Sequence, residues 1–171
     1  MRNFLFGVIF TLVAVALAAC LYVRFGFGEV RGDTPVSSFE TRLMLPGVHA
    51  SIRREAPEMA NPVAPTDENL IKGGKLYADA CEGCHGTPGK PFGAKGIPLI
   101  PAPPEFPIVG TELSEAQVFW VAKHGIRRTG MFANGAFAKD DDLWAIAAYI
   151  KRMGTVSQTV KDGIAKPSSH N

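Results

Sequence analysis

Three residues near the middle of the chain have the spacing of a cofactor-attachment site. Cys81, Cys84 and His85 form the pattern C-x-x-C-H. In this pattern each thiol can add to one vinyl group of a haem, and the imidazole that follows can bind the iron from the same side. The pattern therefore predicts one covalently attached haem c, with His85 as the proximal iron ligand and redox chemistry as the result.

Two other uses of a C-x-x-C pair fit the sequence less well. A zinc site needs two more ligands at short spacing, whereas the third cysteine, Cys20, lies far upstream, and His49, His124 and His170 are scattered. A thioredoxin-like pair follows a strand and precedes a helix. Here a helical pattern leads into the pair and a segment rich in glycine and proline follows it, so haem attachment is favoured.

The second iron ligand is predicted to be Met131. It lies in a loop, residues 126–139, from which it can approach the haem on the face opposite His85. A thioether raises the reduction potential, and two strong ligands close the iron to oxygen and peroxide. His124 and an open iron position are the alternatives. Other residues that could in principle serve are His49, His170, Met44, Met59 and Met153, of which Met153 is better explained as core filling.

Helical patterns bring these residues together. A capping residue, Thr66, begins a helix that runs to Cys81, with Gly73, Tyr77 and Cys81 on one face. A capping box at Ser114 begins a second helix, which ends near Gly125, and the three acids from Asp140 begin a third, which ends near Met153. The proline-rich segment 86–111 excludes a long helix or a central strand. The predicted fold class is all-α, with three core helices and loops around one haem.

The beginning of the chain is apolar and uncharged from Asn3 to Val23, which is long enough for a transmembrane helix. We expect residues 1–24 to form a single-pass anchor in a bacterial inner membrane, with the haem domain facing the periplasm. A cleaved signal peptide ending near Ala19 is one alternative. A lipoprotein is the other, because Leu17-Ala18-Ala19-Cys20 resembles a lipobox in which Cys20 is lipidated.

The remaining sequence predicts a stalk over residues 25–65, with one helical piece whose pattern Pro46-Gly47 interrupts. The haem domain follows over 66–154, and a disordered polar tail over 155–171. The net charge is only +2, which does not indicate nucleic-acid binding. With Cys81 and Cys84 on haem, only Cys20 remains, so the soluble part has no disulfide and a covalent haem takes that stabilising role.

From about Asn69 to Met153 the sequence resembles the class I mono-haem cytochromes c. Gly73, Tyr77 and Cys81 are similar to the first helix of that family, and Ile146 and Tyr149 to their partners on the closing helix. Trp144 and Tyr149 also fit a W-x-x-x-x-Y-I ending. The segment 120–131 is similar to the methionine-ligand segment, although Phe132 stands where many members have proline. The resemblance also implies a proline whose carbonyl orients the proximal histidine, with Pro98 and Pro101 as candidates.

The resemblance implies an electron-transfer protein, not an enzyme, that carries electrons from a dehydrogenase-type donor to an oxidase-type acceptor. Lys123, Arg127 and Arg128, together with Lys90 and Lys95, could steer an acidic partner. The rival functions are a small peroxidase-like haem enzyme, which needs an open iron, and a haem sensor with a displaceable sixth ligand. The chain could also be a fixed subunit of a larger complex, bound through residues 25–65.

Overall fold

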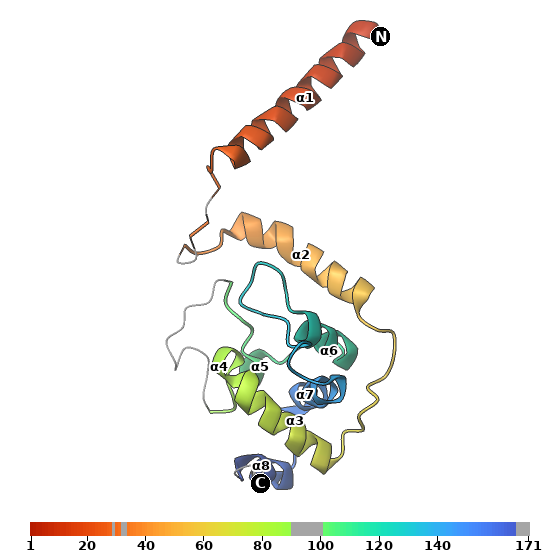
Figure 1. The fold of residues 1–171 in the computed structure, drawn as a ribbon, viewed down its shortest axis with the longest axis vertical. Helices are drawn as coiled ribbons and strands as arrows, with labels where there is room; N and C mark the ends of the chain where they lie inside the picture. Colours follow the sequence, from red (N-terminus) through yellow and green to blue (C-terminus); the bar gives the residue numbers. More distant parts are fainter. Residues whose placement is uncertain (29, 32–33, 90–100, 167–171) are drawn as a thin grey trace. The chain divides into compact units, whose positions relative to one another are not determined.

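The structure is a computed structural model that describes residues 1–28, 30–31, 34–89 and 101–166. The chain divides into two compact units, Met1–Thr34 and Pro35–Asn171. The described residues of the second unit form helices joined by loops (Figure 1). The all-helical fold class predicted from the sequence is confirmed.

The first unit contains one helix, α1, Arg2–Arg24. At 1.5 Å per residue its 23 residues extend about 35 Å, and none of them is buried. Its length and composition suit a membrane span, and a signal sequence near the N-terminus has the same properties. The long apolar helix predicted here is confirmed, while its role as an anchor or a signal is left open.

Three helices form the core of the second unit: α3, Asp67–Ala80; α6, Glu115–His124; and α7, Asp140–Arg152. The predicted caps are present. The Thr66 side chain accepts a hydrogen bond from the Asn69 N–H, and Ser114 and Gln117 form a reciprocal capping box. These local signals explain why sequence patterns located all three helices correctly.

The helices meet through close and specific contacts. Gly73 of α3 lies against the backbone of α7, where an added Cβ would overlap the Ala145 carbonyl group. Nearby, the Phe119 and Trp144 rings of α6 and α7 stack with centroids 4.1 Å apart. Gly73 thus lets α3 and α7 approach closely, which holds the helix that leads into Cys81 against the core.

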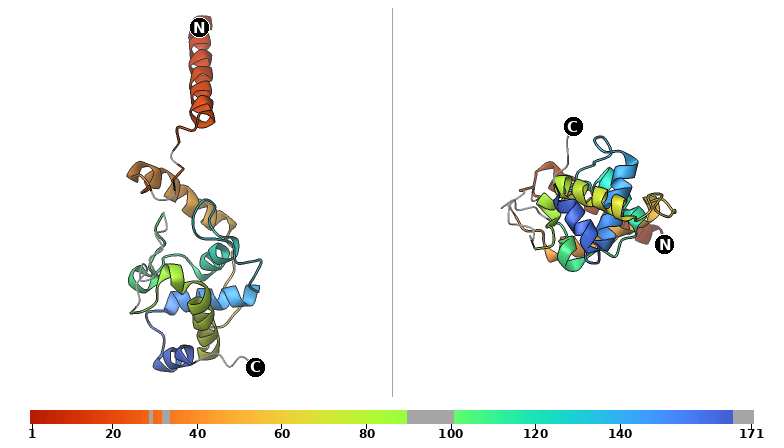
Figure 2. Two further views of the ribbon diagram at one scale, coloured as in Figure 1. Left: turned by 60° about the vertical axis from the view of Figure 1, so that its left-hand side comes forward. Right: turned by 90° about the horizontal axis from the view of Figure 1, so that it is seen from below.

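The predicted disordered tail is wrong for its described part. Residues Gln158–Ala165 form a further helix, α8, which packs against α3 (Figures 1 and 2). Ser157 caps this helix by accepting a hydrogen bond from the Val160 N–H. Val160 is fully buried, with Val156 and Ile164 packed around it. Val160 and Ile164 lie one turn apart on one apolar face of α8, and Val156 just before the helix adds to its burial.

The predicted stalk does contain a helix, but that helix is not interrupted and is packed on the core. Helix α2, Ser38–Glu55, runs through Pro46, which the sequence had suggested as an interruption. A proline inside a helix removes one backbone hydrogen bond but does not prevent the helix from continuing. Helix α2 contacts α6, and Ile52, in the C-terminal half of α2, is only 3% exposed. Residues from 35 onward therefore belong to the same compact unit as the haem motif.

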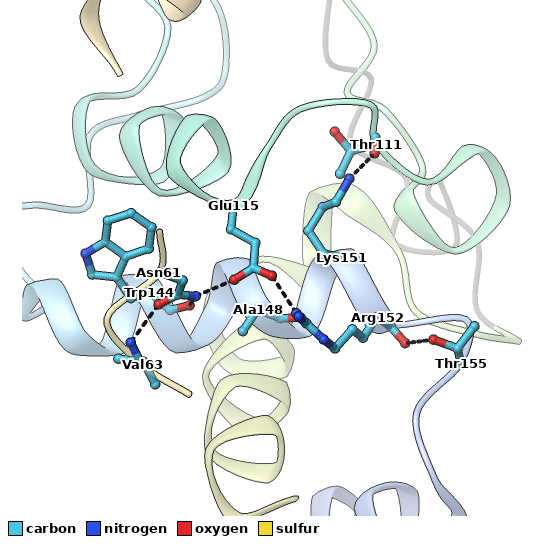
Figure 3. Close-up of polar contacts among 9 residues, drawn as sticks. All are labelled: Asn61, Val63, Thr111, Glu115, Trp144, Ala148, Lys151, Arg152 and Thr155. Atoms are coloured by element: carbon cyan, nitrogen blue, oxygen red, sulfur yellow. Dashed lines mark hydrogen bonds and ion pairs between the residues drawn. The ribbon is translucent and has the colours of Figure 1, made fainter. Parts of the chain in front are cut away.

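A polar clamp fastens the segment after α2 to the core (Figure 3). The Asn61 side-chain amide donates to the Glu115 carboxylate, at 2.6 Å, and to the Trp144 carbonyl oxygen, at 3.0 Å. The same carboxylate accepts from Arg152 of α7, at 2.6 Å. Because the group is partly buried, its members are costly to leave unpaired. Asn61, Glu115 and Arg152 thus join α6 and α7 to the incoming chain.

Candidate haem site

The C-x-x-C-H residues lie on one short turn directly after α3. Helix α4, Glu82–His85, follows without a break, and the Cys81 carbonyl accepts hydrogen bonds from the N–H groups of Cys84, at 3.1 Å, and His85, at 3.0 Å. Gly86 ends the turn with φ +72°, a conformation that glycine adopts without strain. The turn gathers both thiols and the imidazole at the end of one rigid helix, as haem attachment requires.

The imidazole of His85 is held from two sides. Its Nδ1 atom is 2.9 Å from the Pro104 carbonyl oxygen, and its ring stacks on Phe106 with centroids 4.5 Å apart. Phe106 begins the short helix α5, Phe106–Val109. When Nδ1–H donates to the carbonyl, Nε2 is the nitrogen left to bind a metal, and the ring orientation is fixed. His85 is therefore prepared to act as a ligand through Nε2.

The orienting proline is Pro104, which corrects both candidates taken from the sequence. Pro101 is described but does not bond to His85, and Pro98 lies outside the described residues. The segment between His85 and α5 contains several prolines, and only the path of the chain decides which carbonyl reaches the imidazole. Sequence spacing could not make this choice.

Burial sets the protonation of the site. It lowers the pKa of His85, and the hydrogen bond to the Pro104 carbonyl opposes that shift in part. Burial also raises the pKa of the Cys81 thiol to about 11, with Cys84 adding to the effect. A buried environment disfavours charge. His85 is thus kept in the neutral form that can bind a metal.

Tyr77 plays a part that the sequence did not reveal. It is fully buried against Tyr149 of α7, and its hydroxyl donates a 2.6 Å hydrogen bond to the Gly86 carbonyl oxygen. Sequence reasoning identified Tyr77 only as a helix contact. The hydrogen bond ties the residue that follows His85 back onto α3, so the turn is fixed at both ends.

Met131 lies in a loop whose backbone is held by local hydrogen bonds. The Thr129 hydroxyl donates to the Ile126 carbonyl, at 2.8 Å, and accepts from the Met131 N–H, at 3.0 Å. The Met131 carbonyl accepts from the Ile126 N–H at 2.9 Å. Gly125 precedes this turn with φ +67°, and an added Cβ there would overlap the Met131 carbonyl. Met131 contacts His85, so residues far apart in the sequence meet at one place.

The other candidate ligands occupy different surroundings. His124 is exposed at the end of α6, beside the Trp120 ring. Met153 is 3% exposed and belongs to the hydrophobic core, as predicted. His49, Met44 and Met59 are exposed, and His170 lies outside the described residues. Among the part of the chain that the structure describes, no cluster of three or more His, Cys, Asp or Glu side chains could hold a metal ion.

The basic residues near the Met131 loop separate into two groups. Lys123 is paired with Asp140, at 2.8 Å, and lies over the Phe119 ring, so it is used within the fold. Arg127 and Arg128 are exposed, and Arg128 has φ +64°. Lys90 and Lys95 lie outside the described residues. Of the described basic residues proposed for docking, the two arginines remain at the surface.

The donor set fits a covalently attached haem. Two thiols and a neutral imidazole on one turn, at the end of a helix packed across a second helix, define a domain of the cytochrome c class. Comparison with protein families agrees, because residues 68–150 match the family described as cytochrome c oxidase, cbb3-type, subunit III. Residues 68–150 are thus a mono-haem cytochrome c domain of that family.

Membership of this family defines the cofactor of residues 68–150 and their class of function. The domain is of an electron-carrier family, and its C-x-x-C-H turn, with Cys81, Cys84 and His85, implies covalent haem c. Cytochrome c domains are extracytoplasmic. Helices α1, α2 and α8 lie outside the matched residues. No solved structure matches the chain.

Proposed function

We propose that this protein is a one-electron carrier whose single haem iron is held by His85 and Met131. The observation that supports the proposal is the contact between these two residues, one from the attachment turn and one from the loop after α6. Haem bound in this way supplies reversible one-electron redox chemistry at potentials raised by the thioether. With both axial positions filled by protein, substrate has no direct access to the iron.

The protein's contribution is to hold the ligands still. Pro104 and Phe106 fix the plane of the His85 imidazole, and Tyr77 fixes the chain that follows it. On the other side, the Thr129 hydrogen bonds hold the backbone of Met131. Ligands that do not rearrange when the charge on the iron changes favour fast electron transfer, because a preorganised site has little to reorganise.

Apolar side chains near both ligands suit the faces of a porphyrin. Ile108 and Val109 follow the ring that stacks on His85, and Phe132 follows Met131 directly. All three expose more than half of their surface in the polypeptide. We propose that they contact the haem and limit the access of water, which also tunes the redox potential.

For partners, we propose an oxidase-type acceptor and a dehydrogenase-type donor. The family description, which names an oxidase subunit, supports the acceptor. Arg127 and Arg128, exposed beside the Met131 loop, would steer an acidic partner. The double variant Arg127→Gln/Arg128→Gln should slow electron exchange several-fold at low salt and little at high salt. Lys161→Gln, which removes an exposed charge on α8, is the control, and equal rates in both variants would contradict the docking role.

We further propose that α1 remains attached and anchors the protein in a bacterial inner membrane, with the haem domain in the periplasm. The helix ends at Arg24, and apolar residues continue past Cys20 through Leu21, Tyr22 and Val23. Mass spectrometry of the mature protein tests this. An intact N-terminus supports the anchor, whereas a chain that begins after Ala19 supports a signal peptide, or a lipoprotein if Cys20 carries lipid.

An absorption spectrum with and without carbon monoxide tests the electron-carrier proposal. The expected result is a low-spin spectrum in both oxidation states, which carbon monoxide leaves unchanged in the reduced protein, since both axial positions are filled. A high-spin spectrum, or ready carbon monoxide binding by the native protein, would contradict it and would favour the peroxidase-like enzyme or the sensor.

A further inference from the structure

Helix α2 has two different apolar faces. Val48 and Ile52 lie one turn apart and form the inner face of α2, a helix that contacts α6, and Ala56 is the C-cap that follows. Ile52 is 3% exposed and Ala56 is 9% exposed. This face is satisfied by packing within the unit, so it needs no further partner.

The other face has no such partner in the described structure. Phe39, Leu43, Pro46 and Ala50 recur at intervals of three or four residues, which places them together on one side of the helix. Phe39 is 72% exposed and Leu43 is 63% exposed. A large aromatic and a large aliphatic side chain that are exposed on adjacent turns indicate an interaction surface. We call Phe39, Leu43, Pro46 and Ala50 the outer face of α2.

The charges beside the outer face are mostly positive, although Glu40 also borders it. Arg42 follows Phe39 by three residues and Arg53 follows Ala50 by three, so each lies next to the apolar row. Both are exposed. Phenylalanine and leucine flanked by arginine are typical of helices that lie in the interface of an anionic bilayer, where the guanidinium groups meet lipid phosphates.

The chain itself brings this face to a membrane. Thirteen residues separate the end of α1 at Arg24 from the start of α2 at Ser38, and they span at most about 45 Å when fully extended. The two large apolar residues of the outer face, Phe39 and Leu43, are in the first two turns of α2, at the end joined to this tether. An anchored α1 would hold them at high effective concentration beside the lipid surface.

We propose that the outer face of α2 lies on the anionic lipid surface and so fixes how the haem domain is held at the membrane. The inference rests on the proposed retention of α1 as an anchor. Because α2 is packed on α6 and the clamp of Asn61, Glu115 and Arg152 holds the segment after it, a docked α2 would orient the whole second unit. The linker 25–37 would then set only its distance.

The test uses the full-length holoprotein in vesicles of phosphatidylglycerol and phosphatidylethanolamine. In a Cys20→Ala background, Leu43→Cys places one reactive thiol on the outer face, and Thr159→Cys places one on the exposed surface of α8 as a control. Alkylation by a charged, membrane-impermeant maleimide is followed at both positions. The haem absorption spectrum and flotation with the vesicles verify folding and anchoring.

We expect the thiol at position 43 to react at least tenfold more slowly than the thiol at position 159. Equal rates in vesicles would overturn the proposal. Equal rates in vesicles with protection in native membranes would also overturn it, and would assign the outer face to a protein partner instead. Failure of the protein to float with the vesicles would contradict the anchor itself, and with it the tether on which this inference depends.

Discussion

The two proposed iron ligands are held in different ways. His85 stands on a turn fixed by the end of α3, with its ring bonded to Pro104 and stacked on Phe106. Met131 stands in a loop, where Thr129 and Ile126 hold its backbone. The histidine side is fixed by packed helices and the methionine side by local hydrogen bonds. We therefore expect damage on the histidine side to cost stability and damage on the methionine side to change ligation.

The largest effect is expected at the crossing of α3 and α7. Gly73→Val would place side-chain atoms against the Ala145 carbonyl group, and since backbone cannot move aside cheaply, we expect a loss of about 3 kcal/mol or more in the free energy of unfolding. Denaturant unfolding of the holoprotein measures it. Gly154→Ala, at a site with nothing within 4 Å, is the control, and a similar small loss in both variants would contradict the close crossing.

A smaller effect is expected from Tyr77→Phe. The variant leaves the buried Gly86 carbonyl without its 2.6 Å hydrogen bond, so we expect a loss of about 1–2 kcal/mol in the free energy of unfolding with an unchanged haem spectrum. Tyr149→Phe is the matched control, because the described residues provide no hydrogen bond to that hydroxyl. If Tyr77→Phe changed the ligation spectrum and left stability intact, it would be wrong to assign stability to the histidine side and ligation to the methionine side.

The smallest effect on stability is expected from Thr129→Val. This variant should instead change the haem spectrum in the presence of carbon monoxide. This variant removes both hydrogen bonds of the hydroxyl and should cost about 1 kcal/mol or less, while carbon monoxide should now displace Met131 measurably. Thr155→Val is the matched control, since that hydroxyl also donates to a carbonyl three residues earlier, that of Arg152. Equal resistance to carbon monoxide in both variants would remove Thr129 as a positioning residue.

Local signals were the part of the fold that the sequence made predictable. The caps at Thr66 and Ser114 and the acids from Asp140 located three helices, because a cap depends only on residues within one turn. The sequence also places Gly73 and Tyr77 on one face of α3, and both contact α7, Gly73 at the Ala145 carbonyl group and Tyr77 at the Tyr149 ring.

The predictions were wrong where contacts between residues distant in the sequence determine the structure. The sequence predicts a disordered tail where α8 forms, because polar residues surround Val160 and Ile164 and the burial of these two comes from packing against α3. Asn61 gave no signal, since its partners, Glu115 and Trp144, are distant in sequence. Pro104 was missed for the same reason, because the fold alone selects one carbonyl from a proline-rich segment.

X-ray absorption at the iron edge tests the central claim most directly, because it reports the atoms bound to the metal. The native oxidised protein should show one sulfur scatterer among nitrogen neighbours, and Met131→Ala should lose it. Met153→Ala, which removes a buried core methionine, should keep the sulfur signal while losing about 2–5 kcal/mol of stability. A native spectrum without sulfur, or one that Met131→Ala leaves unchanged, would contradict His85 and Met131 as the axial pair.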